Sequence, residues 1–223
     1  MEITGRSLLV AGASGGLGTP LARELAGRGA RLTLVARRED RLRSVPVDAV
    51  RVAADLRLPA EAERVVELAV AEHGRLDGVV NAAGVVAFGP AVETSTDTVE
   101  ELFLSNAFLP IFLFQAALPR LEDGAVLLNV TGVVAEHPVA GMSAYSASKA
   151  AISAWLTAVR REVRRRGITV IDARPGHTET GLAGHPIAGT APSFKPGHDP
   201  EVVARRLVQA IVDDEPELLP AAF

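Results

Sequence analysis

Cysteine is absent from this chain of 223 residues. Its absence excludes disulfides, thiol nucleophiles and metal sites built on cysteine. An excess of positive charge is also lacking, because the formal net charge is −4 at pH 7. We therefore expect neither nucleic acid nor an anionic membrane as a partner, and a small-molecule substrate instead. Three histidines, His177, His185 and His198, share one late segment, but their spacing fits no compact ligand set, so no metal is expected.

Long hydrophobic runs are scarce as well. The most apolar stretch, Ala107 to Leu118, has about half of the ~20 residues that a membrane-spanning helix needs, and it contains a proline. We interpret it as a buried helix face or a subunit contact. The first residues, Met1 to Arg6, show no basic region followed by an apolar core. We therefore expect no secretory signal and predict a cytoplasmic location.

Apolar segments of strand length alternate with helical patterns along the whole chain, in which 48% of the residues are hydrophobic. Near-continuous apolar strands are typical of a parallel sheet covered by helices on both faces. The expected strands are 7–11, 32–35, 49–53, 78–81, 125–130, 168–172 and 218–219, and the expected helices are 19–27, 59–74, 96–118, 143–166 and 200–213. The pattern predicts one doubly wound α/β domain over residues 1–223, with a loop at about 176–200.

A glycine-rich turn, GASGGLG, follows the first expected strand. Gly12, Gly16 and Gly18 permit a tight turn, close approach of a pyrophosphate and close packing of the next helix. The N-terminus of that helix then faces the phosphates. The alternative is a plain connection between strand and helix, and the position after the first strand favours the phosphate site.

Two arginines, Arg37 and Arg38, follow the second expected strand. In dinucleotide-binding folds an acidic residue near this point binds the ribose hydroxyls, whereas arginine accommodates a 2′-phosphate. The sequence therefore favours NADP(H) over NAD(H). Arg37 is the preferred contact because it comes first after the strand. The alternative is a solvated basic turn beside Glu39 and Asp40.

The only tyrosine of the chain, Tyr145, lies four residues before Lys149, and only two of the 23 basic residues are lysines. Residues four apart on a helix share one face. A nearby cation lowers the pKa of a tyrosine, which can then exchange a proton with a carbonyl or alcohol oxygen. The alternative is an ordinary amphipathic pair, which would be the default for this spacing without other motifs.

Several motifs together resemble the short-chain dehydrogenase/reductase family. They are GASGGLG, Asp55, NAAG at 81–84, Asn106, YSASK at 145–149 and ARPG at 173–176, in family order over nearly the whole chain. The resemblance implies a Rossmann-type fold and NADP(H)-dependent interconversion of a carbonyl and an alcohol. The alternatives are an NADP-binding protein without redox activity, acting as a sensor or scaffold, and a non-redox enzyme on the same fold.

The resemblance also implies roles for particular residues. Tyr145 would be the acid/base, Lys149 its activator and a ligand of the nicotinamide ribose, and Asn106 the anchor of a proton-relay water. The implied cofactor contacts are Gly12, Ser14, Gly16, Leu17, Gly18, Arg37, Arg38, Asp55, Leu56, Asn81, Ala83, Gly84, Tyr145, Lys149, Pro175, Gly176, Thr178 and Thr180. Arginine cannot replace Lys149 in this scheme, because its planar fork differs from a compact ammonium.

One family residue is missing. The family has a serine thirteen residues before the catalytic tyrosine, and this chain has Gly132 there, after Thr131. Loss of a donor to the substrate oxygen costs on the order of 3 kcal/mol in a transition state. The alternatives are that Thr131 supplies the hydroxyl, that a substrate hydroxyl, a water or Ser143 does so, or that the protein binds NADP without turnover. We prefer the second.

The residues expected around the substrate are mostly apolar: Val86, Phe88, Val133, Val134, Val139, Met142, His177 and Leu182. They favour a hydrophobic or aromatic small molecule. A homodimer or homotetramer is expected through apolar residues of two long helices, namely Phe108, Leu109, Ile111, Phe112, Phe114, Ala151, Trp155 and Val159. The alternative is that these residues pack within one chain.

Overall fold

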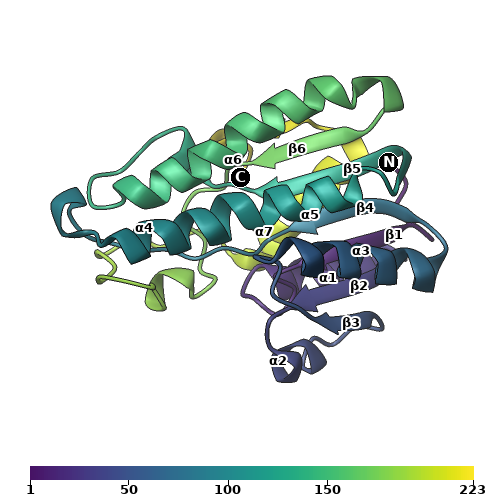
Figure 1. Cartoon of the computed structure of the whole chain (residues 1–223), viewed down its shortest axis with the longest axis horizontal. Helices are drawn as coiled ribbons and strands as arrows, with labels where there is room; N and C mark the ends of the chain where they lie inside the picture. Colours follow the sequence, from purple (N-terminus) through teal and green to yellow (C-terminus); the bar gives the residue numbers. More distant parts are fainter.

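A seven-stranded sheet in the order β3-β2-β1-β4-β5-β6-β7 runs through the centre of the computed structural model, which describes residues 1–223. Its strands are β1 (Ser7–Ala11), β2 (Arg31–Ala36), β3 (Val50–Ala53), β4 (Leu76–Asn81), β5 (Leu121–Val130), β6 (Thr169–Ala173) and β7 (Glu217–Leu218). Every pairing is parallel, so all carboxyl ends meet at one edge (Figure 1). The doubly wound α/β sheet predicted from the sequence is confirmed.

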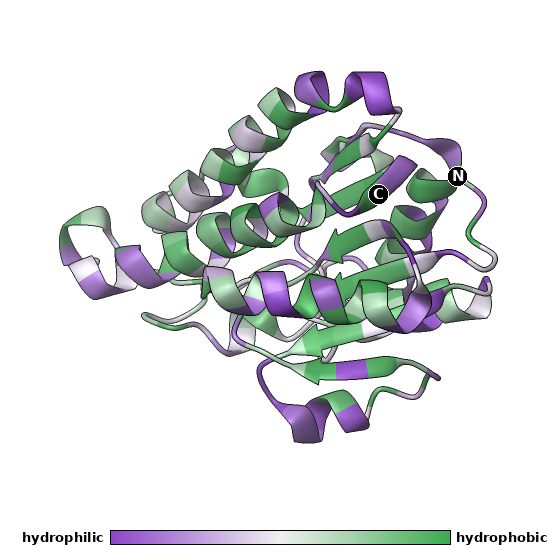
Figure 2. Cartoon of the chain, turned by 45° about the vertical axis from the view of Figure 1, so that its right-hand side comes forward, coloured by the Kyte–Doolittle hydropathy of each residue, from purple (hydrophilic) through white to green (hydrophobic).

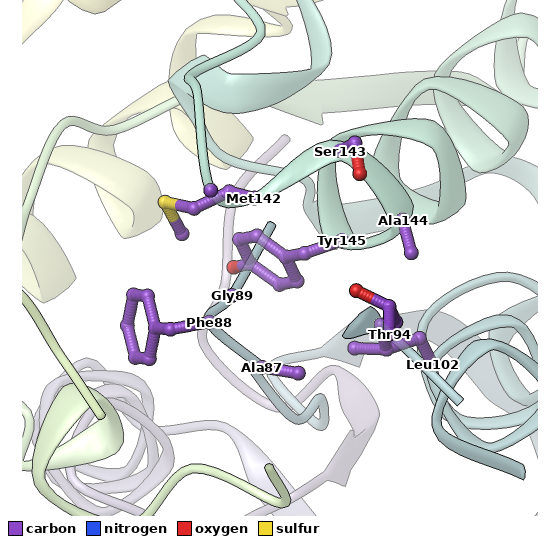
Figure 3. A pocket seen from close by; sticks show the side chains of 10 residues that line it. Ala87, Phe88, Gly89, Thr94, Leu102, Met142, Ser143, Ala144 and Tyr145 are labelled. Carbon is purple, nitrogen blue, oxygen red and sulfur yellow. The ribbon is translucent and has the colours of Figure 1, made fainter. Parts of the chain in front are cut away.

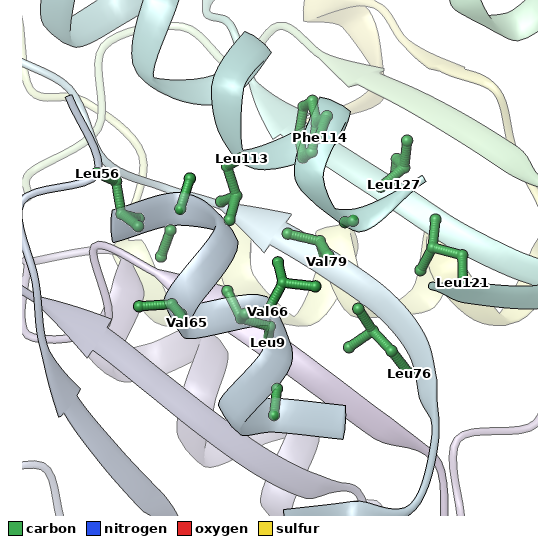
Figure 4. Close-up of a cluster of buried hydrophobic side chains, with 14 of the residues drawn as sticks. Leu9, Leu56, Val65, Val66, Leu76, Val79, Leu113, Phe114, Leu121 and Leu127 are labelled. Atoms are coloured by element: carbon green, nitrogen blue, oxygen red, sulfur yellow. The ribbon is translucent and has the colours of Figure 1, made fainter. Parts of the chain in front are cut away.

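Helices cover both faces of this sheet. They are α1 (Gly18–Gly27), α2 (Glu39–Arg43), α3 (Pro59–His73), α4 (Thr96–Phe103), α5 (Leu109–Ala117), α6 (Ser143–Glu162) and α7 (Pro200–Asp213). One core joins the sheet to α3, α5 and α6, and Figure 4 shows its side chains interdigitating. A second core joins the opposite face to α1 and α7. The strands are mostly apolar, whereas polar residues lie on the outer sides of the helices (Figure 2).

The structure differs from the predicted elements at two places. The short helix α2 was not predicted, because five residues are too few to display a helical hydrophobic period. The expected helix 96–118 is divided by a π-helical turn at Leu104–Phe108, between α4 and α5. Turns of this kind insert an extra residue and recur at functional sites. This one contains Asn106.

The helical stretch Thr96–Ala117 has the length and apolarity of a membrane span. Leu113, Phe114 and Ala117 of this stretch are fully buried against the sheet, which explains its apolar character by packing within the chain. Phe108 is 46% exposed and its ring stacks on that of Phe112. Three of the apolar residues expected at a subunit contact, Leu109, Phe114 and Val159, are buried within the monomer. Their side chains cannot take part in such a contact.

The chain reverses its direction of winding at β1, which lies between β2 and β4. Open α/β sheets bind ligands at such a point, outside the carboxyl ends of the strands. The longest connection at this edge is the segment between β6 and α7, which contains only a 3₁₀ turn at Leu182–Gly184. The predicted site residues all follow strands at this edge or lie on the helices beside it.

Candidate active site

The glycine-rich turn after β1 is held against the turn after β4. Gly12 has φ of +74°, and a side chain there would place its Cβ 2.6 Å from the backbone nitrogen of Ala83. Only glycine allows this approach. The side chain of Leu17 packs in the core beneath the turn, so only the Leu17 backbone faces the carboxyl edge of the sheet. The two turns form one surface at the predicted pyrophosphate position.

A hollow of about 440 Å³ opens beside this turn, where α1 and α7 begin. Its walls include Ser14, Gly16, Thr19 and the ion pair between Arg23 and Glu201, and it has no hydrophobic lining. The N-terminal amides of α1 face it with the positive end of the helix dipole. These residues fit the phosphates of a dinucleotide.

The two arginines after β2 have different partners. Arg38 donates two hydrogen bonds to Asp40, at 3.1 and 2.5 Å, and these raise the pKa of its guanidinium. Arg37 is exposed and makes no ion pair. Its charge reaches Asp55, where it contributes to lowering the carboxyl pKa. Arg37 is therefore the guanidinium that is available to an anion at this edge.

Asp55 belongs to a charged network that the sequence did not predict. Its carboxylate accepts hydrogen bonds from Arg57 at 2.8 and 2.6 Å, and these hold the pKa of Asp55 below its usual range. Arg57 also donates to Glu101, which accepts from Ser105 in the π turn. The network links Asp55, one of the predicted cofactor contacts, to the turn that carries Asn106. Leu56 points into the core (Figure 4), so its side chain lies away from this surface.

A buried chain of hydrogen bonds crosses the ends of β4 and β5. Asn81 donates to Asn129 at 2.8 Å, and Asn129 donates to Thr131 Oγ1 at 2.8 Å. Asn81 also accepts from the backbone of Ala83. Thr131 is 1% exposed. Its hydroxyl is therefore engaged below the site, and the structure does not support the alternative in which Thr131 replaces the missing serine.

Tyr145 lies at the beginning of α6 and is 9% exposed. Its ring packs against Ala87, Phe88 and Met142, and its hydroxyl points toward Phe88 and away from Ser143 (Figure 3). Burial raises the pKa of Tyr145 to about 12. The expectation of a lowered pKa is wrong, because burial removes water from the phenolate and thereby disfavours the charged form. The structure also does not bring Ser143 to the hydroxyl.

Lys149 is buried on the same helix, with 6% of its surface exposed. Its Nζ donates a hydrogen bond of 3.0 Å to the carbonyl oxygen of Val130, at the end of β5. Burial lowers the pKa of Lys149 to about 8, and the charge of Asp172 opposes that change. The ammonium is thus held at the sheet edge and is poised to lose its proton just above neutral pH.

Asn106 is fixed by three hydrogen bonds in the π turn. Its side chain accepts from the Val85 amide at 2.9 Å and donates to the Val85 carbonyl at 3.0 Å and to Ser148 Oγ at 3.1 Å. Ser148 donates in turn to the Tyr145 carbonyl. A Cβ on Gly84 would lie 2.9 Å from Asn106 Oδ1 and 3.4 Å from Lys149 Nζ. Asn106 and Lys149 therefore both lie close to Gly84, and Ser148 links Asn106 to the backbone of Tyr145.

Gly132 has a backbone conformation that follows from its lack of a side chain. Its φ is +92° and its ψ is 155°. This region is essentially restricted to glycine. The amides of Thr131 and Gly132 both donate to the carbonyl of Ala173, which holds the end of β5 in this form. The backbone conformation at position 132 is thus one that a serine rarely adopts, in addition to the absence of a hydroxyl there.

The segment after β6 folds over Tyr145. The Ile187 amide donates to Val86, and the Phe88 amide donates to Ala188. Phe194 stacks on His177 at 4.6 Å between ring centroids and lies 6.0 Å from Phe88. These contacts cover the candidate site with apolar and aromatic side chains.

The beginning of this segment lies against the glycine-rich turn after β1. Thr178 donates to the carbonyl of Gly176, directly after Pro175, and the Thr180 carbonyl lies against Gly16. Two residues predicted to line the pocket, Val139 and Leu182, are exposed instead.

Comparison with known proteins identifies relatives of this arrangement. The family described as short chain dehydrogenase matches residues 6–188. A dehydrogenase/reductase SDR family protein 7-like of Anopheles gambiae is 30% identical over 240 residues, which cover 98% of this chain and 75% of that protein. The cyclic-di-GMP-binding biofilm dispersal mediator protein of Escherichia coli is 32% identical over 181 residues, 79% of this chain and 75% of that protein.

A solved structure extends the comparison. A short chain dehydrogenase from Burkholderia cenocepacia in complex with NADP superposes with a TM-score of 0.88 and 26% identity, covering 99% of this chain and 97% of that chain.

Proposed function

Because this chain belongs to the short-chain dehydrogenase family, we propose that it is an NADP(H)-dependent oxidoreductase that interconverts a carbonyl and an alcohol on a hydrophobic or aromatic small molecule. The observation that carries the proposal is the placement of Tyr145, Lys149 and Asn106 at the carboxyl edge of the sheet, where Asn106 and Lys149 both lie close to Gly84. No other place in the fold combines these groups.

The preference for NADP(H) is supported by the exposed, unpaired guanidinium of Arg37 and by the NADP complex of the Burkholderia cenocepacia relative. Arginine pairs well with phosphate because its donors match the phosphate oxygens. Ser14, within the glycine-rich turn, adds a hydroxyl to the wall of the polar hollow. These groups would hold the cofactor by its phosphates.

The bound nicotinamide would supply or accept the hydride, and the chain's own residues would manage the proton. In reduction, Tyr145 Oη donates its proton to the substrate oxygen, and the ammonium of Lys149 stabilises the phenolate that remains. A tyrosine with a pKa of about 12 is fully protonated at neutral pH, which suits a donor. Asn106 would hold a water through which the phenolate regains its proton. In the oxidative direction the same groups move the proton the other way.

The missing hydroxyl at position 132 leaves one role to be filled. Thr131 is engaged with Asn129, and Ser143 points elsewhere. We therefore assign the polarisation of the substrate oxygen to a hydroxyl of the substrate itself or to an ordered water. A substrate with a second polar group beside its carbonyl fits this assignment.

The apolar surroundings of Tyr145 support a hydrophobic substrate. Val86, Phe88, Val134 and Met142 form one cluster with the tyrosine. The proposal includes a cytoplasmic location and a homodimer or homotetramer, supported by the exposed Phe108 beside α5. A particle of monomer mass in sedimentation at working concentration would contradict the association.

The proposal is tested by the loss of NADPH absorbance in the presence of ketones, aldehydes and quinones. Tyr145→Phe removes only the hydroxyl, so it should abolish turnover while NADPH fluorescence still reports binding. Ser146→Ala is the matched control, because it removes a buried hydroxyl of the neighbouring residue that has no hydrogen-bond partner. Equal turnover by Tyr145→Phe and wild type would overturn the proposal.

A second candidate is a nucleotide-binding protein without turnover. Gly132 favours it, and so does the Escherichia coli relative that is named for binding cyclic di-GMP. NADPH binding without consumption of any panel substrate would support this candidate.

A further inference from the structure

We propose that Asp172 is a positioning residue for Lys149, a buried negative charge beneath α6 that keeps the ammonium of Lys149 protonated inside the protein. Its importance for catalysis rests on the proposed function, whereas the coupling between the two charges does not. Nothing in the motifs of the sequence points to Asp172, which lies within the strand before ARPG.

The geometry places Asp172 and Lys149 on the same side of the sheet. Asp172 Oδ2 accepts a hydrogen bond of 2.6 Å from Ser153, and Ser153 follows Lys149 by four residues on α6. Residues four apart share a helix face and are separated by about 6 Å along the axis. The carbonyl that receives Lys149 Nζ belongs to Val130, which pairs with Ala173, the residue after Asp172. The Asp172 carboxylate therefore lies beneath α6, about one helical turn along the helix from the Lys149 ammonium.

The two carboxylate oxygens of Asp172 have different surroundings. Oδ2 accepts from Ser153 and twice from Arg174, at 3.1 and 2.8 Å. Oδ1 is buried and has no hydrogen-bond partner. Asp172 as a whole is 1% exposed. A buried, incompletely paired carboxylate is costly, so it acts strongly on any charge in the same low-dielectric region.

Few other charges face Lys149. The neighbouring groups on α6 are Tyr145, Ser148 and Ser153, the π turn offers Asn106, and β5 offers a carbonyl, none of which is charged at neutral pH. Arg174 pairs with Asp172, donates to Ser153 Oγ at 3.3 Å, and also reaches Glu136 and Glu217. Asp172 is thus the charge that opposes the loss of the Lys149 proton caused by burial.

A purely structural role makes a different prediction. If Asp172 serves only to fasten Arg174 between β6 and β7, its removal lowers stability but leaves the protonation of Lys149 unchanged. The composition of the chain allows a direct measurement, because Lys149 and Lys195 are its only lysines. Protein labelled with ¹³C at lysine Cε gives two signals, and Lys195→Arg assigns them.

The experiment is an NMR titration of the labelled, ligand-free protein. In Asp172→Asn the midpoint of the Lys149 titration should fall by about one pH unit. In Ser153→Ala, which removes a hydrogen bond and keeps the charge, the midpoint should stay close to wild type. In Arg174→Gln, which removes the cation that neutralises Asp172, it should rise.

An unchanged midpoint in folded Asp172→Asn would overturn the proposal. If that variant does not fold, an unchanged or lowered midpoint in Arg174→Gln would overturn it instead. The titration needs neither cofactor nor substrate. A failure of the proposed oxidoreductase activity would therefore leave its result interpretable, and the reverse also holds.

Discussion

Replacement of Gly132 probes the end of β5 through its backbone. With φ of +92° and ψ of 155°, the residue occupies a region in which a side chain costs about 1–3 kcal/mol. Space is not the limit, because a Cβ there would meet only the Pro175 oxygen at 3.9 Å. Gly132→Ala should therefore lower stability by that backbone cost alone. For a chain of this size the melting temperature should fall by roughly 2–12 °C.

Gly132→Ser carries the same backbone cost and adds the hydroxyl that the family has at this position. We expect its melting temperature, measured by circular dichroism, to match that of Gly132→Ala. Its turnover in the NADPH assay should not exceed that of the wild type, because the unusual backbone directs the side chain away from the position of a serine on a regular strand end. A melting temperature of Gly132→Ala equal to wild type would refute the backbone argument. A gain of turnover in Gly132→Ser would show that the strand end relaxes to admit the hydroxyl.

Three further predictions follow from charges and contacts. Arg37→Ala should weaken the binding of NADPH about tenfold or more and leave the binding of NADH unchanged. Arg38→Ala should change the affinity for either cofactor little, because Arg38 is paired with Asp40. Fluorescence titration measures the two affinities. Burial of the Lys149 ammonium lowers its pKa from 10.5 to about 8 in the folded chain, a destabilisation of about 3 kcal/mol at neutral pH. Since the unfolded chain holds more protons between these values, wild type should gain stability relative to Lys149→Met in urea as the pH rises from 8 to 10.5, and a constant difference would contradict this. Phe194→Ala removes the stacking that holds the late segment, so the Ile187 amide should exchange its hydrogen faster, while an unchanged rate would show that the ring does not restrain it.

The fold could be predicted from the sequence because its strands are buried on both faces. Segments such as Leu8–Ala11, within β1, are apolar at every position, as expected for a strand covered on both faces. The glycine-rich turn and the spacing of Tyr145 and Lys149 are also local patterns, so the sequence placed them on the right elements. The division of the helix at Asn106 was not predictable in this way, since an extra residue in a turn leaves the composition of both flanking helices unchanged.

Features that depend on contacts between residues far apart in the chain could not be predicted from the sequence. Arg57 meets Glu101 across 44 positions of the chain, and no periodicity connects them. The pKa of Tyr145 was misjudged because the sequence displays the neighbouring lysine but not the depth of burial, which acts in the opposite direction. Likewise, the sequence shows that Gly132 lacks a hydroxyl, but it does not show that the backbone there has φ and ψ angles that serine rarely adopts.

The π turn at Leu104–Phe108 changes the number of residues between the two ends of the helical stretch. A helix that contains such a turn holds one residue more than a regular α-helix needs to join the same two ends. The turn that this extra residue creates directs the Asn106 side chain to Val85 and Ser148. One extra residue in the helix thus lets a single side chain join the segment after β4 to α6.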